Sequence, residues 1–178
     1  MGDHEESKMD FEPAVKIRPW RREDAPALQA LADHIDVARW MSGFPHPYTR
    51  NDAEEWTAKA ALQHPPQFFA IEVDGVIGGG AGLEPRDGSH EGVVILGYWL
   101  GRAYWGRGIA NAVVSMLVEH AFSSGFRRVE AHVFAPNAAS LRVLEKCGFT
   151  LEGRLRASYV ELDGTACDEL IFGRINTT

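Results

Sequence analysis

Apolar residues along this chain recur with two different spacings, and the spacing changes several times between its two ends. Some segments alternate or run apolar as β-strands do: residues 15–18, 67–73, 76–83, 93–100, 128–133, 150–155 and 169–175. Others repeat apolar positions every three or four residues, as helices do: residues 24–35, 51–63, 109–123 and 137–146. The resulting order, βααβββαβαββ, predicts a single mixed α/β domain without internal repeats.

Turn and cap residues support the boundaries of these segments. Asp24 suits the N-cap of the first helix, and either Thr49 or Asn51 suits that of the second. Asn137 is the expected cap of the last helix, which Gly148 ends. Asp74-Gly75 and Asp163-Gly164 are typical of turns between paired strands.

Composition and charge narrow the class of protein but do not indicate a function. The 178 residues, 45% of them hydrophobic and 24% charged, suit one globular domain. Residues 1–12 carry −4 of the formal net charge of −7, so we expect a flexible acidic tail there and one domain over residues 13–178. The remaining charge argues against nucleic acid as a partner.

The sequence also gives expectations for the compartment. Apolar runs reach only eight residues, as at 93–100, which is too short to cross a membrane. The N-terminal residues carry no apolar signal region. Cys147 and Cys167 form neither a disulfide framework nor a metal-binding pattern. We therefore expect a cytoplasmic protein without a metal, and no thiol nucleophile.

A glycine-rich segment, GRAYWGRG, separates the strand at 93–100 from the helix at 109–123. A helix N-terminus presents unpaired N–H groups and a partial positive charge, and preceding glycines let an anion approach the backbone. Residues 105–110 therefore suit a phosphate-binding loop, with Arg107 as a cationic neighbour. The same residues also suit a plain turn that packs the strand on the helix.

Three kinds of phosphate-binding loop can be compared with this segment. A P-loop needs Lys followed by Ser or Thr, whereas Ile109-Ala110 stands here. A dinucleotide fingerprint needs a third glycine where Asn111 stands, and the next strand lacks the acidic residue that binds ribose. The third kind matches a known family.

Four motifs in order resemble the GNAT (GCN5-related N-acetyltransferase) superfamily over residues 15–175. Trp105-x-x-Gly108-x-Ala110 resembles its pyrophosphate loop, with tryptophan at the first position as in the RimJ/RimL-type subgroup that acetylates N-termini of ribosomal proteins. The helix from Asn137 to Phe149 is similar to the family's Asn-x-x-Ala/Ser…Glu-Lys-x-Gly-Phe block. The segment at 39–49 and the hairpin after Leu151 resemble the same subgroup.

The resemblance implies the single-domain acyl-CoA N-acyltransferase (GNAT) fold, with a mixed, mostly antiparallel sheet whose central strands splay apart between flanking helices. It implies acetyl-CoA as co-substrate, with its pyrophosphate on the amides of residues 107–111 and its pantetheine arm along the strand at 93–100. The implied cofactor-binding residues are Tyr98, Trp99, Leu100, Trp105, Gly106, Arg107, Gly108, Ile109, Ala110, Asn111 and Asn137.

The catalytic residues follow less directly from the resemblance. Many family members carry a tyrosine seven residues after the conserved asparagine as proton donor, but Leu144 stands there. Ser140 is the nearest hydroxyl and is the expected donor, with Tyr159 as a second choice and direct protonation from solvent as the remaining alternative. The resemblance favours Glu152 as general base. The other candidates for the base are His90, Glu91, Asp33, His34 and Asp36.

The expected reaction transfers acetyl to a primary amine, either a protein N-terminus or a small molecule such as a polyamine, amino sugar or antibiotic. Trp40, Phe44 and Tyr48 flank a proline-rich loop that suits an acceptor groove. Two other classes stay open, a non-catalytic acyl-CoA-binding module and a nucleotide-binding protein. Homodimers are common in the subgroup, and no residue pattern here decides the oligomeric state.

Overall fold

The computed structural model describes residues 13–177, so the acidic segment 1–12 lies outside the described residues. The strands are β1 (Val15–Pro19), β2 (Phe68–Val73), β3 (Val76–Pro85), β4 (Val93–Leu100), β5 (Arg128–Phe134), β6 (Thr150–Val160) and β7 (Ala166–Ile175). The α-helices are α1 (Ala25–Ala32), α2 (Ile35–Ala38), α3 (Arg50–Ala60), α4 (Ile109–Ser123) and α5 (Ala138–Lys146). Short 3₁₀ turns are η1 (Arg22–Asp24), η2 (Gly88–His90) and η3 (Arg102–Tyr104). No helix among these residues is long and apolar enough to cross a membrane.

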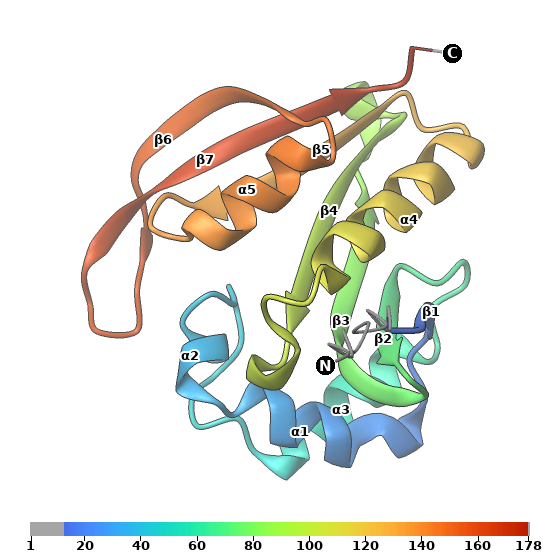
Figure 1. Ribbon diagram of the computed structural model, residues 1–178, viewed down its shortest axis with the longest axis vertical. Helices are drawn as coiled ribbons and strands as arrows, with labels where there is room; N and C mark the ends of the chain where they lie inside the picture. The colour runs from blue at the N-terminus through green and yellow to red at the C-terminus, as the bar shows by residue number, and fades with distance from the viewer. Residues whose placement is uncertain (1–12, 178) are drawn as a thin grey trace, which may run out of the picture.

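One sheet with the strand order β1-β2-β3-β4-β5-β7-β6 organises the molecule (Figure 1). Every neighbouring pair is antiparallel except β4–β5, which is parallel and extends only from Val93–Arg128 to Leu96–Ala131. Beyond this pair β4 stays on β3 and β5 stays on β7. The two central strands therefore separate, which confirms the expected splay and leaves facing edges unpaired inside the molecule.

The two faces of the sheet carry separate cores because successive side chains of a strand point to opposite faces. Ile71 of β2 packs in the larger core with α4, whereas its neighbour Ala70 packs in the smaller core with α1 and α3. In Figure 1, α4 and α5 lie in front of the sheet, and α1–α3 gather at its lower end. The alternation continues along β4, so Tyr98 shares the α4 face with Leu96 while Trp99 belongs to the other face.

Local chemistry confirms most of the boundaries expected from the sequence. β4 and α4 span the predicted residues, and the Asn137 side chain caps α5 by accepting from the Ser140 N–H at 3.2 Å. Asp74 and Gly75 have φ of 52° and 82°, as a tight turn between β2 and β3 requires. Thr49, rather than Asn51, caps α3 through a reciprocal capping box with Asp52.

Three expectations about element lengths are wrong. The second helix ends at Ala60 instead of continuing to Gln63. The first helix ends at Ala32 instead of continuing to Ile35, because the Asp33 carboxylate accepts the Tyr48 N–H and His34 begins α2. Ile35 is consequently 52% exposed. β6 and β7 are longer than expected, since bulges along β6, near Gly153 and Ala157, let an exposed strand stay paired beyond its apolar residues.

Candidate active site

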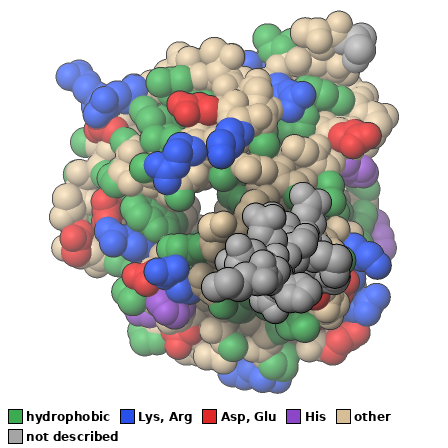
Figure 2. Space-filling view, viewed as in Figure 1, with side chains coloured by type: hydrophobic (Ala, Val, Ile, Leu, Met, Phe, Trp, Pro, Cys, Tyr) green, Lys and Arg blue, Asp and Glu red, His purple; other side chains and the backbone are tan. Residues whose placement is uncertain are grey.

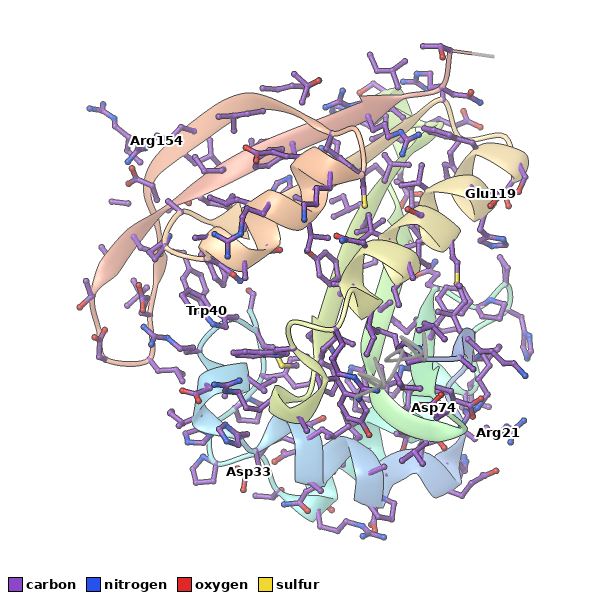
Figure 3. All side chains as sticks on the ribbon, in the orientation of Figure 1. Arg21, Asp33, Trp40, Asp74, Glu119 and Arg154 are labelled. Carbon is purple, nitrogen blue, oxygen red and sulfur yellow. The ribbon has the colours of Figure 1, made fainter. Side chains whose placement is uncertain are left out.

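A groove of about 960 Å³ opens where β4 and β5 separate. Figure 2 shows the molecule hollowed near the centre of this face, with Lys and Arg side chains beside the opening. The chain has five tryptophans, and all of them line the groove. Trp40 lies beside the opening, between α2 and the β6–β7 hairpin (Figure 3). Every residue expected to bind the cofactor lines this groove as well, and so does Ser140.

The glycine-rich loop forms one end of the groove. Gly106 and Gly108 have φ of 73° and 76°, a left-handed conformation that favours glycine. A Cβ atom added at either position would meet no atom within 4 Å, so both positions face open space. Trp105 fixes the loop, because its Nε1 donates to the Leu100 carbonyl at 2.7 Å. The loop therefore presents bare backbone to the groove.

The first turn of α4 suits a phosphate group. Gly108 is the N-cap of α4 and supplies no side-chain acceptor, so the amides of the first turn point into the groove unpaired within the helix. Asn111 lies in this turn, and its Oδ1 is buried without a hydrogen-bond partner among the described residues. Arg107, Arg142 and Lys146 line the same end. Positive charge and open backbone thus coincide, which fits the pyrophosphate of coenzyme A.

A pair of hydroxyl groups lies midway along the groove, on the α4 face of the sheet. Tyr98 Oη and Ser140 Oγ are 2.7 Å apart, and the cap at Asn137 holds the first turn of α5 that carries Ser140. Burial is the main cause that raises the pKa of Tyr98 to about 12. Leu144, at the position where many relatives have tyrosine, is fully buried in the core. Here β4 supplies a phenol that the helix lacks.

A histidine and a glutamate meet on the opposite face of the sheet. His132 lies one position beyond the last β4–β5 pair, and its Nδ1 is 3.5 Å from Oε1 of Glu169 on β7. Both side chains line the groove and are partly exposed. Strand alternation places His132 on the face opposite Ala131, and thus on the side of Trp99 rather than of Tyr98.

His132 was not among the residues expected at the site from the sequence. Alternation along residues 128–133 was the available signal, because it separates His132 from the apolar side of its strand. The Glu169 partner depends on the antiparallel register of β5 and β7, which sequence spacing does not give.

Glu152 lies away from the groove that the other candidates line. It forms a two-point ion pair with Arg128 near the start of β5, at the closed end of the β4–β5 pair. Hydrogen bonding to Arg128 is the main cause that lowers its pKa, which weakens it as a proton acceptor. The structure therefore does not support the assignment of Glu152 as general base.

The alternative candidates for proton donor and general base do not lie at the groove either. Tyr159 stacks on Phe134, with ring centroids 3.7 Å apart, and does not line the groove. Asp33 lies on the outer side of the N-terminal helices (Figure 3). The other base candidates also lie outside the groove lining: His34, Asp36, His90 and Glu91. Cys147 and Cys167 are buried, free and absent from the lining.

Three features define the class of this protein as an acyl-CoA N-acyltransferase. They are a splayed sheet, a glycine-rich loop before a long helix, and a groove that reaches both faces of the sheet. A model of the acetyltransferase (GNAT) domain matches residues 15–150, so the chain belongs to the GNAT family of acetyltransferases. The expected fold and the expected enzyme class, an acetyl-CoA-dependent N-acetyltransferase, are confirmed.

Relatives extend over nearly the whole chain. An uncharacterised N-acetyltransferase, p20 of Bacillus licheniformis, is 30% identical over 89% of this chain and 90% of its own length. RimJ of Mycobacterium smegmatis, solved with a CoA disulfide, is 29% identical with a TM-score of 0.79, covering 90% of this chain and 81% of its own. RimL, the ribosomal L7/L12 acetyltransferase solved with coenzyme A, shares the fold with a TM-score of 0.81 at 22% identity, over 90% and 93% of the two chains. These neighbours agree with the expected RimJ/RimL-type subgroup.

Proposed function

We propose that this enzyme transfers the acetyl group of acetyl-CoA directly to a primary amine within a ternary complex. The observation that carries the proposal is the placement of two proton-handling pairs on opposite faces of the sheet, both lining one groove. Tyr98 and Ser140 lie on the face of α4, beside the cofactor loop. His132 and Glu169 lie on the other face, where an acceptor can enter.

Binding of the cofactor rests on backbone more than on side chains. The loop at Gly108 and the first turn of α4 hold the phosphates, and the unpaired edge of β4 pairs with the pantetheine arm as an added strand. Acetyl-CoA supplies an activated acyl group, so the enzyme needs no covalent intermediate of its own. A backbone N–H near Trp99 or Leu100 stabilises the oxygen that becomes negative during attack.

His132 removes a proton from the attacking amine. The amine must be neutral to act as a nucleophile, and an imidazole in the groove can accept its proton directly or through one water. Glu169 faces His132 Nδ1 at 3.5 Å and orients the ring, which leaves Nε2 as the acceptor. His132 is thus the proposed base in place of Glu152.

Tyr98 and Ser140 protonate the leaving thiolate. A phenol with a raised pKa of about 12 stays protonated near neutral pH, and its 2.7 Å contact with Ser140 forms a short proton path. This pair compensates for the absence of a tyrosine at the position of Leu144. Without another proton donor, that absence would favour a module that binds acyl-CoA without turnover.

The acceptor is a primary amine, on a protein N-terminus or on a small molecule. The likeness to RimJ at 29% identity supports the first alternative. The test is an acceptor screen of N-terminal peptides and small amines with acetyl-CoA, read as release of free thiol. Acetylation with turnover supports the proposal, whereas coenzyme A binding without turnover on any amine would identify a binding module instead.

A further inference from the structure

The acceptor face of the groove is built from aromatic rings. We call the set Trp20, Phe44, Tyr48, Trp56 and Phe68 the aromatic pocket; all five side chains line the groove. Trp56 is at its centre, with its ring centroid 5.3 Å from Trp20, 5.6 Å from Phe68 and 6.4 Å from Phe44. Phe44, Trp56 and Phe68 are only partly buried, so their rings offer apolar surface to a ligand.

Glycines clear the sheet beside this pocket. Gly82 of β3 pairs with Phe68 on one side and with Gly97 of β4 on the other, and His132 of β5 lies next across the splay. A Cβ at Gly82 would lie 2.9 Å from the Phe68 ring, whereas a Cβ at Gly97 would meet nothing within 4 Å. The Phe68 ring therefore covers Gly82, and the Gly82–Gly97 row is open at Gly97, between this ring and His132.

Two polar groups of the pocket have no partner in the part of the chain that the structure describes. Trp20 and Tyr48 are 2% and 3% exposed, and neither the indole Nε1 nor the phenol Oη makes a hydrogen bond. Buried polar groups are normally paired, and leaving them unpaired is unfavourable. Both atoms are buried and do not face the open part of the groove, so Trp20 and Tyr48 form the back of the pocket, and a ligand contacts the partly buried rings of Phe44, Trp56 and Phe68.

Charge along the groove changes sign between its two ends. The cofactor end carries Arg107, Arg142 and Lys146. Among the described residues that line the acceptor side are Asp52, Glu55, Glu84 and Glu169, with Lys59 as the cation among them. The acidic side chains attract the acceptor as an ammonium ion, before the amine is deprotonated. The aromatic rings contact an apolar group of the acceptor.

We propose that the acceptor of this acetyltransferase is a primary amine that carries a bulky aromatic group close to its nitrogen. The aromatic group binds in the aromatic pocket, and the amine lies over the Gly82–Gly97 row, directed at His132. The inference rests on the proposed function and narrows its acceptor. The shared chemistry fits either a free arylalkylamine or a chain whose first residue is aromatic.

The test compares acceptors that differ only in this group. Ethylamine is paired with phenethylamine, and Ala-initiated peptides are paired with Phe-initiated peptides of otherwise identical sequence. We expect kcat/KM to be at least tenfold higher for the aromatic member of one pair, and the pair that shows the difference identifies the source. Equal kcat/KM within both pairs would overturn the inference and leave the proposed function intact. Coenzyme A binding without turnover of any amine would overturn both.

Two variants locate the effect. Phe44→Ala removes a ring from the pocket and should bring the two members of the preferred pair within threefold of each other, whereas Phe122→Ala on α4, outside the groove, should keep the preference. Gly97→Val adds a side chain on the face of His132 and should lower kcat/KM for the amine at least tenfold. Its control is Gly153→Val on β6, outside the groove, where an added Cβ meets only Ile171 at 3.8 Å. An undiminished preference in Phe44→Ala, or full activity in Gly97→Val, would contradict the assignment.

Discussion

The hydroxyl groups of Tyr98 and Ser140 lie 2.7 Å apart, although 42 positions separate the two residues in the chain. β4 and α5 meet here because β4 leaves the sheet edge of β5 and the cap at Asn137 begins α5 beside it. The proposed proton donor, Tyr98, therefore belongs to a strand, and its partner Ser140 belongs to the helix that follows β5.

Tyr98→Phe removes this donor while keeping the ring in place. We expect kcat to fall by about 100-fold, as for loss of a general acid, with little change in coenzyme A affinity. Stopped-flow or steady-state thiol release measures kcat, and calorimetry measures affinity. Tyr159→Phe, outside the groove, is the matched control and should retain wild-type kcat. A Tyr98→Phe enzyme with wild-type kcat would remove the pair from the mechanism.

The raised pKa of Tyr98 also gives a prediction for alkaline solution. A phenol with a pKa of about 12 keeps its proton well above neutrality, so kcat should not decline through loss of this donor between roughly pH 7 and pH 10. A pH–kcat profile in this range measures it. A decline present in the wild type and absent in Tyr98→Phe would show that the phenol titrates lower.

Gly108→Glu should abolish binding of coenzyme A. The new carboxylate would enter the space reserved for phosphates and repel them, so we expect the Kd to rise by about 100-fold or more. Gly88→Glu is the control, because Gly88 also has positive φ and open space but lies in η2, outside the groove. Equal Kd values for the two variants would contradict a phosphate site at the loop.

His132→Gln should remove the proton acceptor and lower kcat/KM by about 100-fold. Steady-state thiol release with acetyl-CoA and a primary amine measures the loss. Glu169→Gln should lower kcat/KM less, since Glu169 only orients the ring, and Glu152→Gln should leave kcat/KM unchanged. Wild-type kcat/KM in His132→Gln would show that another group is the base.

The same residues show how much of the fold and of the site could be predicted from the sequence. β4, α4 and the Asn137 cap were predictable, because strand residues, glycines and a cap follow one another without a gap. The His132–Glu169 and Tyr98–Ser140 pairs were not, since each joins segments whose relative register only the folded sheet decides. Glu152 was misplaced for the same reason: it sits at a bulge of β6, where it pairs with Arg128.

Stability should depend on Asp24, which is buried beside Arg18. Burial raises the pKa of this carboxyl, but hydrogen bonds from Arg18, at 2.7 and 2.9 Å, and from the Arg21 N–H outweigh it, so the net pKa is lowered. A lowered pKa stabilises the fold above the unfolded value of 3.8, and this stabilisation is lost as pH falls through the folded value.

Asp24→Asn should therefore reduce the free energy of unfolding by about 2 kcal/mol at neutral pH and by progressively less in acid. Urea unfolding at pH 7 and at low pH measures the difference. Asp87→Asn, on an exposed loop, should change neither value. A constant difference at both pH values would mean that the carboxylate charge is not its source.

The confinement of every tryptophan to the groove gives the protein a built-in optical reporter. Tryptophan fluorescence, excited selectively over tyrosine, arises only from residues that line the groove, so its intensity and emission wavelength should respond to bound substrates. Trp105 stands at the cofactor end and Trp20 with Trp56 at the acceptor end. Replacing one end at a time by phenylalanine would let the order of arrival of the two substrates be watched without any attached dye.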